Sequence, residues 1–185
     1  MKKKVWILNH YATNTMLDHG GRHYWFAKYL TRAGYDVRIF CASTVHDTDR
    51  NFNVGDSGYC EKEVDGLKYT LIETSDYAGN GKSRVKNMYQ FYRRIFRVAK
   101  KYEKPNVIFA SSVHPLTLLA GIKIAKKMGV KCICEVRDLW PESLVEYDII
   151  SRKHIITKLM YRGERRLYKK ADSLFYAWCI FNIYN

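Results

Sequence analysis

The residues best suited to chemistry follow one apolar segment, 132–136, in which Glu135 is the one charged residue. Arg137 and Asp138 come directly after it, and Trp140 follows two residues later. A guanidinium can hold a phosphate with its planar fork of donors, and a carboxylate can orient a hydroxyl group. A structural ion pair between Arg137 and Asp138 is the alternative. Trp140 can stack on a ligand, or form a rigid packing turn with the proline that follows it.

Further candidates stand near two other apolar segments. His114 follows segment 107–110 and precedes a proline, and His10 follows segment 5–8. Gly20, Gly21 and Arg22 come where a helical pattern begins. Glycine lets the backbone approach a ligand closely, and a helix start offers unpaired N–H groups to an anion. An ordinary turn before a helix, and a structural histidine, remain the alternatives. The glycine fingerprint of dinucleotide-binding domains is absent.

Apolar segments and helical patterns alternate along the chain. The expected strands are 5–8, 36–42, 67–72, 107–110, 130–136 and 173–177, and the expected helices are 20–33, 83–102, 115–128 and 152–170. Residues 43–65 are polar with two glycines and are expected to form a long loop. Strands separated by helices predict an α/β fold, in which a Rossmann-like parallel sheet is covered by helices on both faces.

The composition bounds the class of protein. With 185 residues, 47% of them hydrophobic, the chain is long enough for one domain with a sizeable core. No apolar run is long enough to span a bilayer, and the N-terminus does not read as a signal peptide, so a cytoplasmic location is expected. The five cysteines lack metal-ligand spacing and are expected to be free thiols, so no metal site is predicted.

The net charge of +14 is concentrated in two stretches, 82–104 and 152–170. In the helix expected at 83–102, Arg93, Arg94 and Arg97 lie away from the apolar stripe. This basic side is either a solvated face or a surface for anionic lipid at the inner face of the cell membrane. No nucleic-acid-binding motif is visible, so no nucleic-acid partner is expected.

Three separated motifs resemble one enzyme family. The first motif comprises residues 5–9, Gly20-Gly21-Arg22-His23-Tyr24 and the pattern up to residue 37. The second motif is Ala110-Ser111-Ser112-Val113-His114-Pro115-Leu116-Thr117. The third motif is Glu135-Val136-Arg137-Asp138-Leu139-Trp140-Pro141-Glu142-Ser143. Together they resemble the N-terminal half of family-4 glycosyltransferases of the GT-B fold, which build bacterial surface polysaccharides such as capsule or O-antigen. The last two motifs are similar to a subgroup that includes fucosamine-type transferases.

The resemblance implies two Rossmann-like domains, of which the N-terminal one holds the acceptor and the C-terminal one the nucleotide sugar. We therefore expect residues 1–176 to be the acceptor-side domain of a retaining transferase that uses no metal or cofactor. The acceptor would be lipid-linked or a polysaccharide. Residues 177–185 are apolar where the family continues into a polar loop, which indicates a truncation or frameshift. The donor domain is expected to be absent, so the chain alone is predicted to be inactive.

The resemblance also implies roles for the candidate residues. His114, Arg137 and Asp138 are expected to be catalytic, although relatives often carry a histidine where this chain has Arg137-Asp138. Substrate binding is expected at His10, Gly20, Gly21, Arg22 and Trp140. The expected partners are a nucleotide sugar, a glycan or lipid-linked acceptor, and an anionic membrane surface. The alternative function is that of a non-catalytic, basic Rossmann-like binding protein for anionic membrane or nucleic acid.

Overall fold

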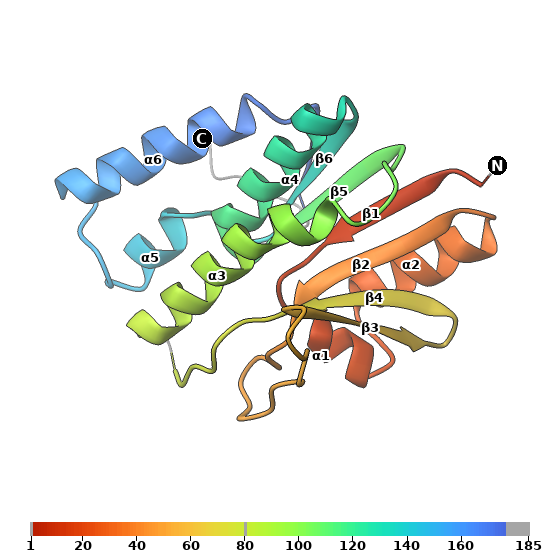
Figure 1. Ribbon diagram of the computed structural model, residues 1–185. Helices are drawn as coiled ribbons and strands as arrows, with labels where there is room; N and C mark the ends of the chain where they lie inside the picture. Colours follow the sequence, from red (N-terminus) through yellow and green to blue (C-terminus); the bar gives the residue numbers. More distant parts are fainter. Residues whose placement is uncertain (1, 80, 177–185) are drawn as a thin grey trace.

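The computed structural model describes residues 2–79 and 81–176. Within them one seven-stranded sheet has the order β3-β4-β2-β1-β5-β6-β7 (Figure 1). Every neighbouring pair is parallel except β3 with β4, which is antiparallel. The strands are β1 (Lys4–Leu8), β2 (Asp36–Ala42), β3 (Tyr59–Val64), β4 (Leu67–Ile72), β5 (Val107–Ser112), β6 (Lys131–Val136) and β7 (Ser173–Tyr176).

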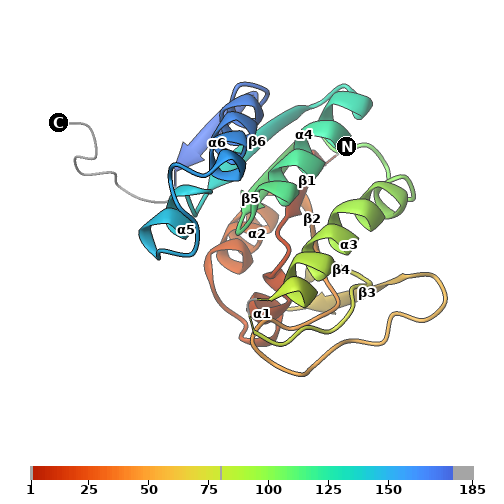
Figure 2. The same cartoon turned by 90° about the vertical axis from the view of Figure 1, so that its left-hand side faces the viewer.

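Helices cover both faces of this sheet (Figures 1 and 2). They are α1 (Ala12–Leu17), α2 (Arg22–Arg32), α3 (Lys82–Ala99), α4 (Pro115–Met128), α5 (Glu142–Glu146) and α6 (Ile155–Tyr168). Alternate residues of β1 enter two separate cores. Val5 and Ile7 pack in the core that includes residues of α1 and α2, whereas Trp6 and Leu8 pack in the core with α3 and α4. This period of two is what a strand buried on both faces requires.

Helix α4 shows how local sequence sets an element. It begins with Pro115, which suits the first turn because that position needs no N–H partner, and it ends at Gly129 with φ of 62°. At Gly121 an added Cβ would lie 2.6 Å from Cβ of Ala110 in β5. The glycine therefore allows the close contact between α4 and the sheet.

The predicted α/β Rossmann-like class is confirmed, and the strand expected at 173–177 is β7. The expectation of a loop across 43–65 was wrong for β3, which pairs with β4 through a turn at Asp65 and Gly66. Both turn residues have positive φ, 52° and 74°. Strand β3 lies at the sheet edge with no residue fully buried, and its exposed charged residues conceal the strand pattern. Helix α1 was also not predicted, and the tail 177–185 lies outside the described residues.

Candidate functional site

Most of the predicted site residues lie at one end of the sheet. In the parallel register Leu8 of β1 is beside Ala110 of β5, and Ser112 of β5 is beside Val136 of β6. The segments that leave these three strands carry His10, His114, and Arg137 with Asp138. The carboxyl ends of parallel strands are where open α/β sheets hold ligands. Figure 2 faces this end of the molecule, where α5 and the N-terminal end of α3 also lie.

His10 and His114 are in direct contact although 104 residues separate them. Nε2 of His114 lies 2.9 Å from Nδ1 of His10, and both side chains are buried. Burial holds the pKa of His114 well below its ordinary value of 6.5, with further lowering by His10 and Arg84. Burial likewise lowers the pKa of His10 to about 3, against the opposing effect of its hydrogen bond to Asn87. Both rings are therefore neutral near pH 7.

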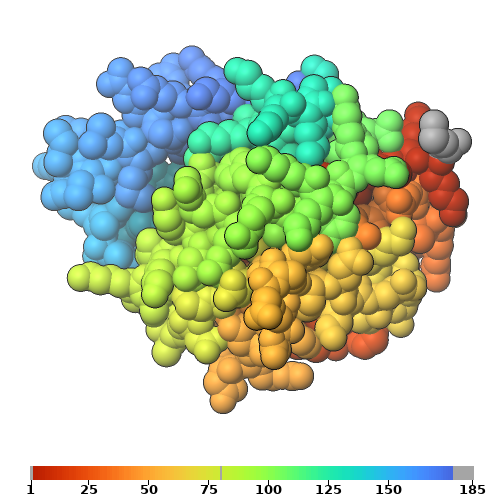
Figure 3. Space-filling view, viewed as in Figure 1, coloured from red at the N-terminus to blue at the C-terminus, as the bar shows by residue number. Residues whose placement is uncertain are grey.

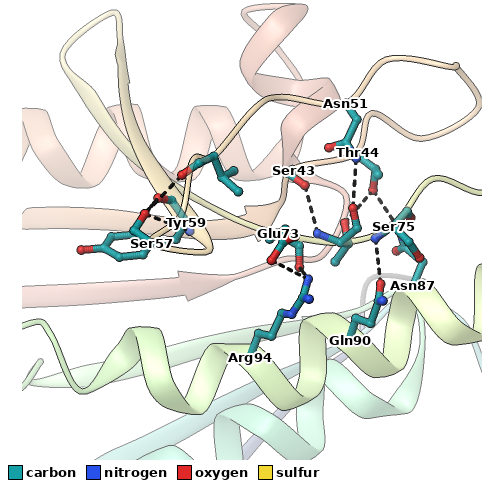
Figure 4. A network of polar contacts seen from close by, with 12 residues as sticks. Ser43, Thr44, Asn51, Ser57, Tyr59, Glu73, Ser75, Asn87, Gln90 and Arg94 are labelled. Atoms are coloured by element: carbon teal, nitrogen blue, oxygen red, sulfur yellow. Dashed lines mark hydrogen bonds and ion pairs between the residues drawn. The ribbon is translucent and has the colours of Figure 1, made fainter.

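Asn87 of α3 fixes His10 from the other side. Its Oδ1 lies 2.7 Å from Nε2 of His10, and its Nδ2 donates to the carbonyl of Ser75 at 2.7 Å and to Thr44 Oγ1 at 3.0 Å. Figure 4 shows Asn87 within a polar network that joins α3 to the segment after β4, where Gln90 Oε1 accepts from the backbone N–H of Ser75. Asn87 was not predicted, because a polar residue on the buried side of a basic helix carries no sequence signal.

A layer of polar and aromatic side chains lies next to the two histidines. The Tyr11 ring stacks on His46 with ring centroids 4.3 Å apart, and its hydroxyl accepts from Nε of Arg84 at 3.0 Å. Nδ1 of His46 lies 2.6 Å from the hydroxyl of Tyr77. Burial lowers the pKa of His46. These contacts combine a guanidinium with hydroxyl groups and neutral rings, a set that suits a polar ligand with negative charge.

A second buried cluster surrounds Glu135 of β6, which is fully buried. Its Oε1 accepts from Nη1 of Arg22 at 2.7 Å, and its Oε2 lies 2.8 Å from Nε2 of His23. Asn9 completes the cluster, because its Oδ1 accepts from the backbone N–H of Tyr11 while its Nδ2 faces Nδ1 of His23 at 2.8 Å. The proton of His23 is therefore on Nε2, from which it donates to Glu135.

Glu135 stays charged in this cluster. Burial raises its pKa, but the hydrogen bonds from His23 and Arg22 outweigh burial and leave it at about 2. The carboxylate uses one of the five N–H donors of Arg22, whose side chain is 41% exposed. Arg22 is thus held in place and still presents donors at the strand ends. A charged residue inside an apolar segment was the available signal for Glu135.

Arg137 and Asp138 do not form a pair. The ion pairs of residues 2–79 and 81–176 include none between them, so the interpretation as a structural ion pair is wrong. Loss of solvation raises the pKa of Asp138 above its ordinary value of 3.8, although Arg137 and Arg84 oppose this. The backbone N–H of Arg137 donates to Ser112 Oγ at 3.1 Å. Trp140 is half-buried and donates from Nε1 to the carbonyl of Val113 at 3.2 Å, which joins the segment after β6 to that after β5.

Gly20 and Gly21 precede α2 as predicted. Gly21 is the N-cap with φ of 81° and ψ of 166°, and an added Cβ would lie 2.9 Å from Cγ2 of Thr15. Such a backbone conformation is almost confined to glycine. At Gly20 the nearest atom to an added Cβ is 3.5 Å away. Only Gly21 is therefore required by the turn that brings Arg22 to Glu135.

The three arginines of α3 that were predicted to face a membrane differ in their surroundings. Arg93 and Arg97 are exposed, whereas Arg94 donates to the carbonyl of Glu73 at 2.7 Å and lies 3.0 Å from its carboxylate (Figure 4). In the space-filling view α3 lies on the surface between α4 and the segments that precede β3 (Figure 3). Arg94 therefore fastens α3 to the end of β4, and Arg93 and Arg97 remain candidates for a surface contact.

Among the described residues no group of three or more His, Cys, Asp or Glu side chains is arranged to hold a metal ion. Nor is any helix within the described ranges both long and apolar enough to cross a membrane. The thiols of Cys41, Cys60, Cys132 and Cys134 are free, and Cys179 lies outside the described residues.

The fold defines an α/β domain, and the polar residues outside the carboxyl ends of its parallel strands form its candidate ligand site. Residues 21–177 match the glycosyl transferase 4-like domain, and the chain belongs to this glycosyltransferase family. A comparison with curated proteins gives no match.

Two solved structures show weak likeness. A sucrose-phosphate synthase from Thermosynechococcus elongatus is 9% identical over 97% of this chain and 91% of that chain, with a TM-score of 0.48. The FeoB G-domain from Methanococcus jannaschii is 13% identical over 95% of this chain and 86% of that chain, with a TM-score of 0.27. The assignment to the family rests on the domain match.

Proposed function

We propose that this chain is the acceptor-side domain of a retaining glycosyltransferase of cell-surface glycan synthesis. A sugar would pass from a nucleotide diphosphate to a hydroxyl of a lipid-linked or polysaccharide acceptor, and the nucleotide sugar would be held mainly by a second domain. The observation that carries the proposal is the family match over 21–177 together with the polar strand end where His114 and Asp138 lie. The similarity of the last two motifs to fucosamine-type transferases supports an amino sugar as the donor.

The strand-end residues suit this chemistry. Asp138 has a raised pKa, as a group that takes up a proton from a hydroxyl needs, and would orient the acceptor. Arg137 and Arg22 would stabilise negative charge that develops on the leaving diphosphate, because guanidinium groups bind phosphate oxygens in pairs. Trp140 anchors the segment that carries Asp138 and would contact the same substrate.

The acceptor-side assignment is tested by ligand binding to the chain itself. Saturation-transfer NMR would compare a soluble isoprenyl-diphosphate-linked N-acetylhexosamine with UDP-N-acetylglucosamine. We expect the isoprenyl-linked sugar to bind more tightly, and Asp138→Asn to weaken it while Asp56→Asn, at an exposed loop position, does not. Tighter binding of the nucleotide sugar would contradict the assignment. We also expect no sugar transfer by the chain alone, and measurable turnover would contradict that expectation.

A lipid surface is a second proposal, and one observation favours it. In α6 the apolar residues Ile155 and Leu159 are 69% and 61% exposed. Tyr147, Ile149 and Ile156 are exposed beside them in the chain, and we call these five residues the α6 apolar surface. Exposed basic residues surround it, namely Lys153, Lys158, Arg162, Arg165 and Arg166. Apolar side chains flanked by positive charge match an anionic bilayer surface.

The position of this surface fits the proposed acceptor. The N-terminal end of α6 lies at the same end of the molecule as α5 and the carboxyl ends of the strands (Figures 1 and 2). A membrane that contacts the α6 apolar surface would therefore present a lipid-linked acceptor near Asp138. Arg93 and Arg97 would add electrostatic attraction from α3. Under this proposal the protein is peripheral on the inner face of the cell membrane.

A further inference from the structure

The buried ring of His114 has one nitrogen without a partner. Among the described residues nothing forms a hydrogen bond to Nδ1 of His114, although only 1% of this residue is exposed. A buried polar atom without a partner costs free energy, and native proteins pair nearly all such atoms. The nitrogen therefore calls for a functional explanation, and its chemistry depends on whether it carries the proton.

The orientation of the Asn87 side-chain amide determines which ring nitrogen of His10 carries the proton. The carbonyl of Ser75 accepts at 2.7 Å and cannot donate, so the Asn87 atom that faces it is the amide nitrogen. The Asn87 oxygen then faces His10 at 2.7 Å, and it too can only accept. Nε2 of His10 must therefore carry a proton and donate it to Asn87.

The position of the proton on His10 determines the position of the proton on His114. His10 is neutral because burial lowers its pKa to about 3, so a proton on Nε2 leaves its Nδ1 as an acceptor. Nε2 of His114 lies 2.9 Å from that acceptor and must donate to it. Thr117 Oγ1, 3.5 Å from the same nitrogen of His114, does not change this polarity because a hydroxyl can also accept. Neutral His114 is then left with an unprotonated Nδ1.

We propose that Asn87 and His10 are positioning residues that hold His114 as the Nε2–H tautomer, so that its Nδ1 accepts a hydrogen bond from a sugar hydroxyl of the substrate. This deepens the proposed function and rests on it for the identity of the hydroxyl. The hydrogen bonds run from His114 to His10 and from His10 to Asn87, and the Ser75 carbonyl, which follows β4, sets their direction. Neither Asn87 nor His10 needs to touch the substrate.

The proton positions are tested in the wild-type chain by NMR of the ¹⁵N-labelled histidine rings. We expect His10 and His114 to be neutral at pH 7, each with its proton on Nε2, and a scalar coupling across the hydrogen bond between Nε2 of His114 and Nδ1 of His10. A proton on Nδ1 of His114 would overturn the proposal. This measurement needs no variant and no activity, so its outcome is independent of the proposed function.

The role of Asn87 is tested with two variants. Asn87→Leu keeps a similar volume but removes the acceptor, and we expect loss of the coupling between the two histidines. Ser43→Ala is the matched control, because Ser43 Oγ accepts from the backbone N–H of Thr74 in the same network without touching Asn87 (Figure 4). The coupling should persist in this control. An unchanged coupling in Asn87→Leu would overturn the positioning role.

The source of the hydroxyl is tested by two additions to the wild-type chain. The isoprenyl-diphosphate-linked N-acetylhexosamine represents an acceptor, and UDP-N-acetylglucosamine represents a donor. We expect the ¹⁵N resonance of Nδ1 of His114 to shift with the compound whose hydroxyl it accepts, while Nε2 keeps its proton. If saturating amounts of both leave Nδ1 unchanged, the sugar-hydroxyl role is overturned even where the tautomer is as expected.

Discussion

Arg22 and Glu135 form an ion pair in which Nη1 of Arg22 lies 2.7 Å from Oε1 of Glu135, across 113 residues of sequence. The pair fixes the start of α2 to the end of β6. It therefore joins the glycine turn to the segment that carries Arg137 and Asp138. Removal of either partner should lower the stability of the fold and change the geometry of the site.

The first prediction concerns the charge on Glu135. Glu135→Gln should lower the free energy of unfolding by about 3 kcal/mol at pH 7, because it leaves Arg22 and His23 without a buried anion. The pKa of Glu135 falls from 4.5 to about 2 on folding, so its charge stabilises the protein above about pH 4.5. This contribution is lost as the pH falls from 4.5 towards 2.

Chemical denaturation of both proteins between pH 7 and pH 3 measures this effect. The difference between wild type and Glu135→Gln should narrow below about pH 4.5. Glu63→Gln, at an exposed position of β3, is the control and should differ little from wild type at any pH. A difference that stays constant with pH would mean that the charge on Glu135 does not stabilise the fold.

The second prediction separates the two glycines before α2. Gly21→Ala should lower the free energy of unfolding by about 2 kcal/mol, because φ of 81° strains alanine and its Cβ would meet Thr15. Gly20→Ala lies in an ordinary backbone region with no atom closer than 3.5 Å and should change stability by less than about 0.5 kcal/mol. Thermal unfolding of the two variants measures the contrast, and equal effects would argue against the strained turn.

The third prediction concerns catalysis at the end of β6. In a two-domain enzyme that includes this domain, Arg137→Ala and Asp138→Asn should each reduce turnover by a factor on the order of 100, the loss expected for a charge-stabilising or orienting group. The melting temperature should change little, because the two residues form no ion pair with each other whose loss would leave a buried charge. Turnover per folded molecule measures the effect. Full specific activity of both variants would remove them from the site.

The fourth prediction concerns the lipid surface. Vesicles rich in anionic phospholipid should sediment the chain, and rising salt should weaken the binding. Ile155→Asp with Leu159→Asp should weaken binding at least tenfold, since burial of each side chain is worth about 1.5–3 kcal/mol. Tyr29→Asp, at a residue of α2 that is 60% exposed, is the matched control.

Charge is tested separately on α3. Arg93→Glu with Arg97→Glu should also weaken binding about tenfold or more, from roughly 1 kcal/mol for each basic residue near an anionic surface. Arg94 is left unchanged because its ion pair with Glu73 fastens α3. Equal binding to neutral vesicles, or unchanged binding by both double variants, would contradict the lipid-surface proposal. The basic residues of α3 and α6 would then only face solvent.

Much of the fold was predictable from local pattern. Apolar segments such as 132–136 alternate with helical stripes, and this alternation alone indicates a parallel sheet. Strand β3 was missed because one side of an edge strand faces solvent, so charged residues take the place of the apolar pattern. The position of His114 and Asp138 at the strand ends was also predictable, since it follows from the order of the elements.

The sequence by itself determined which residue types stand at the strand ends, because local periodicity fixes where each strand and helix stops. Only the tertiary structure decided their partners. Asn87 meets His10 across 77 residues, and Arg22 meets Glu135 across 113. Hydrogen bonds and ion pairs act over a few ångströms, and closeness in space between distant segments is set by sheet order and helix packing. For that reason the sequence shows neither that Glu135 pairs with Arg22 nor that a chain of hydrogen bonds reaches His114.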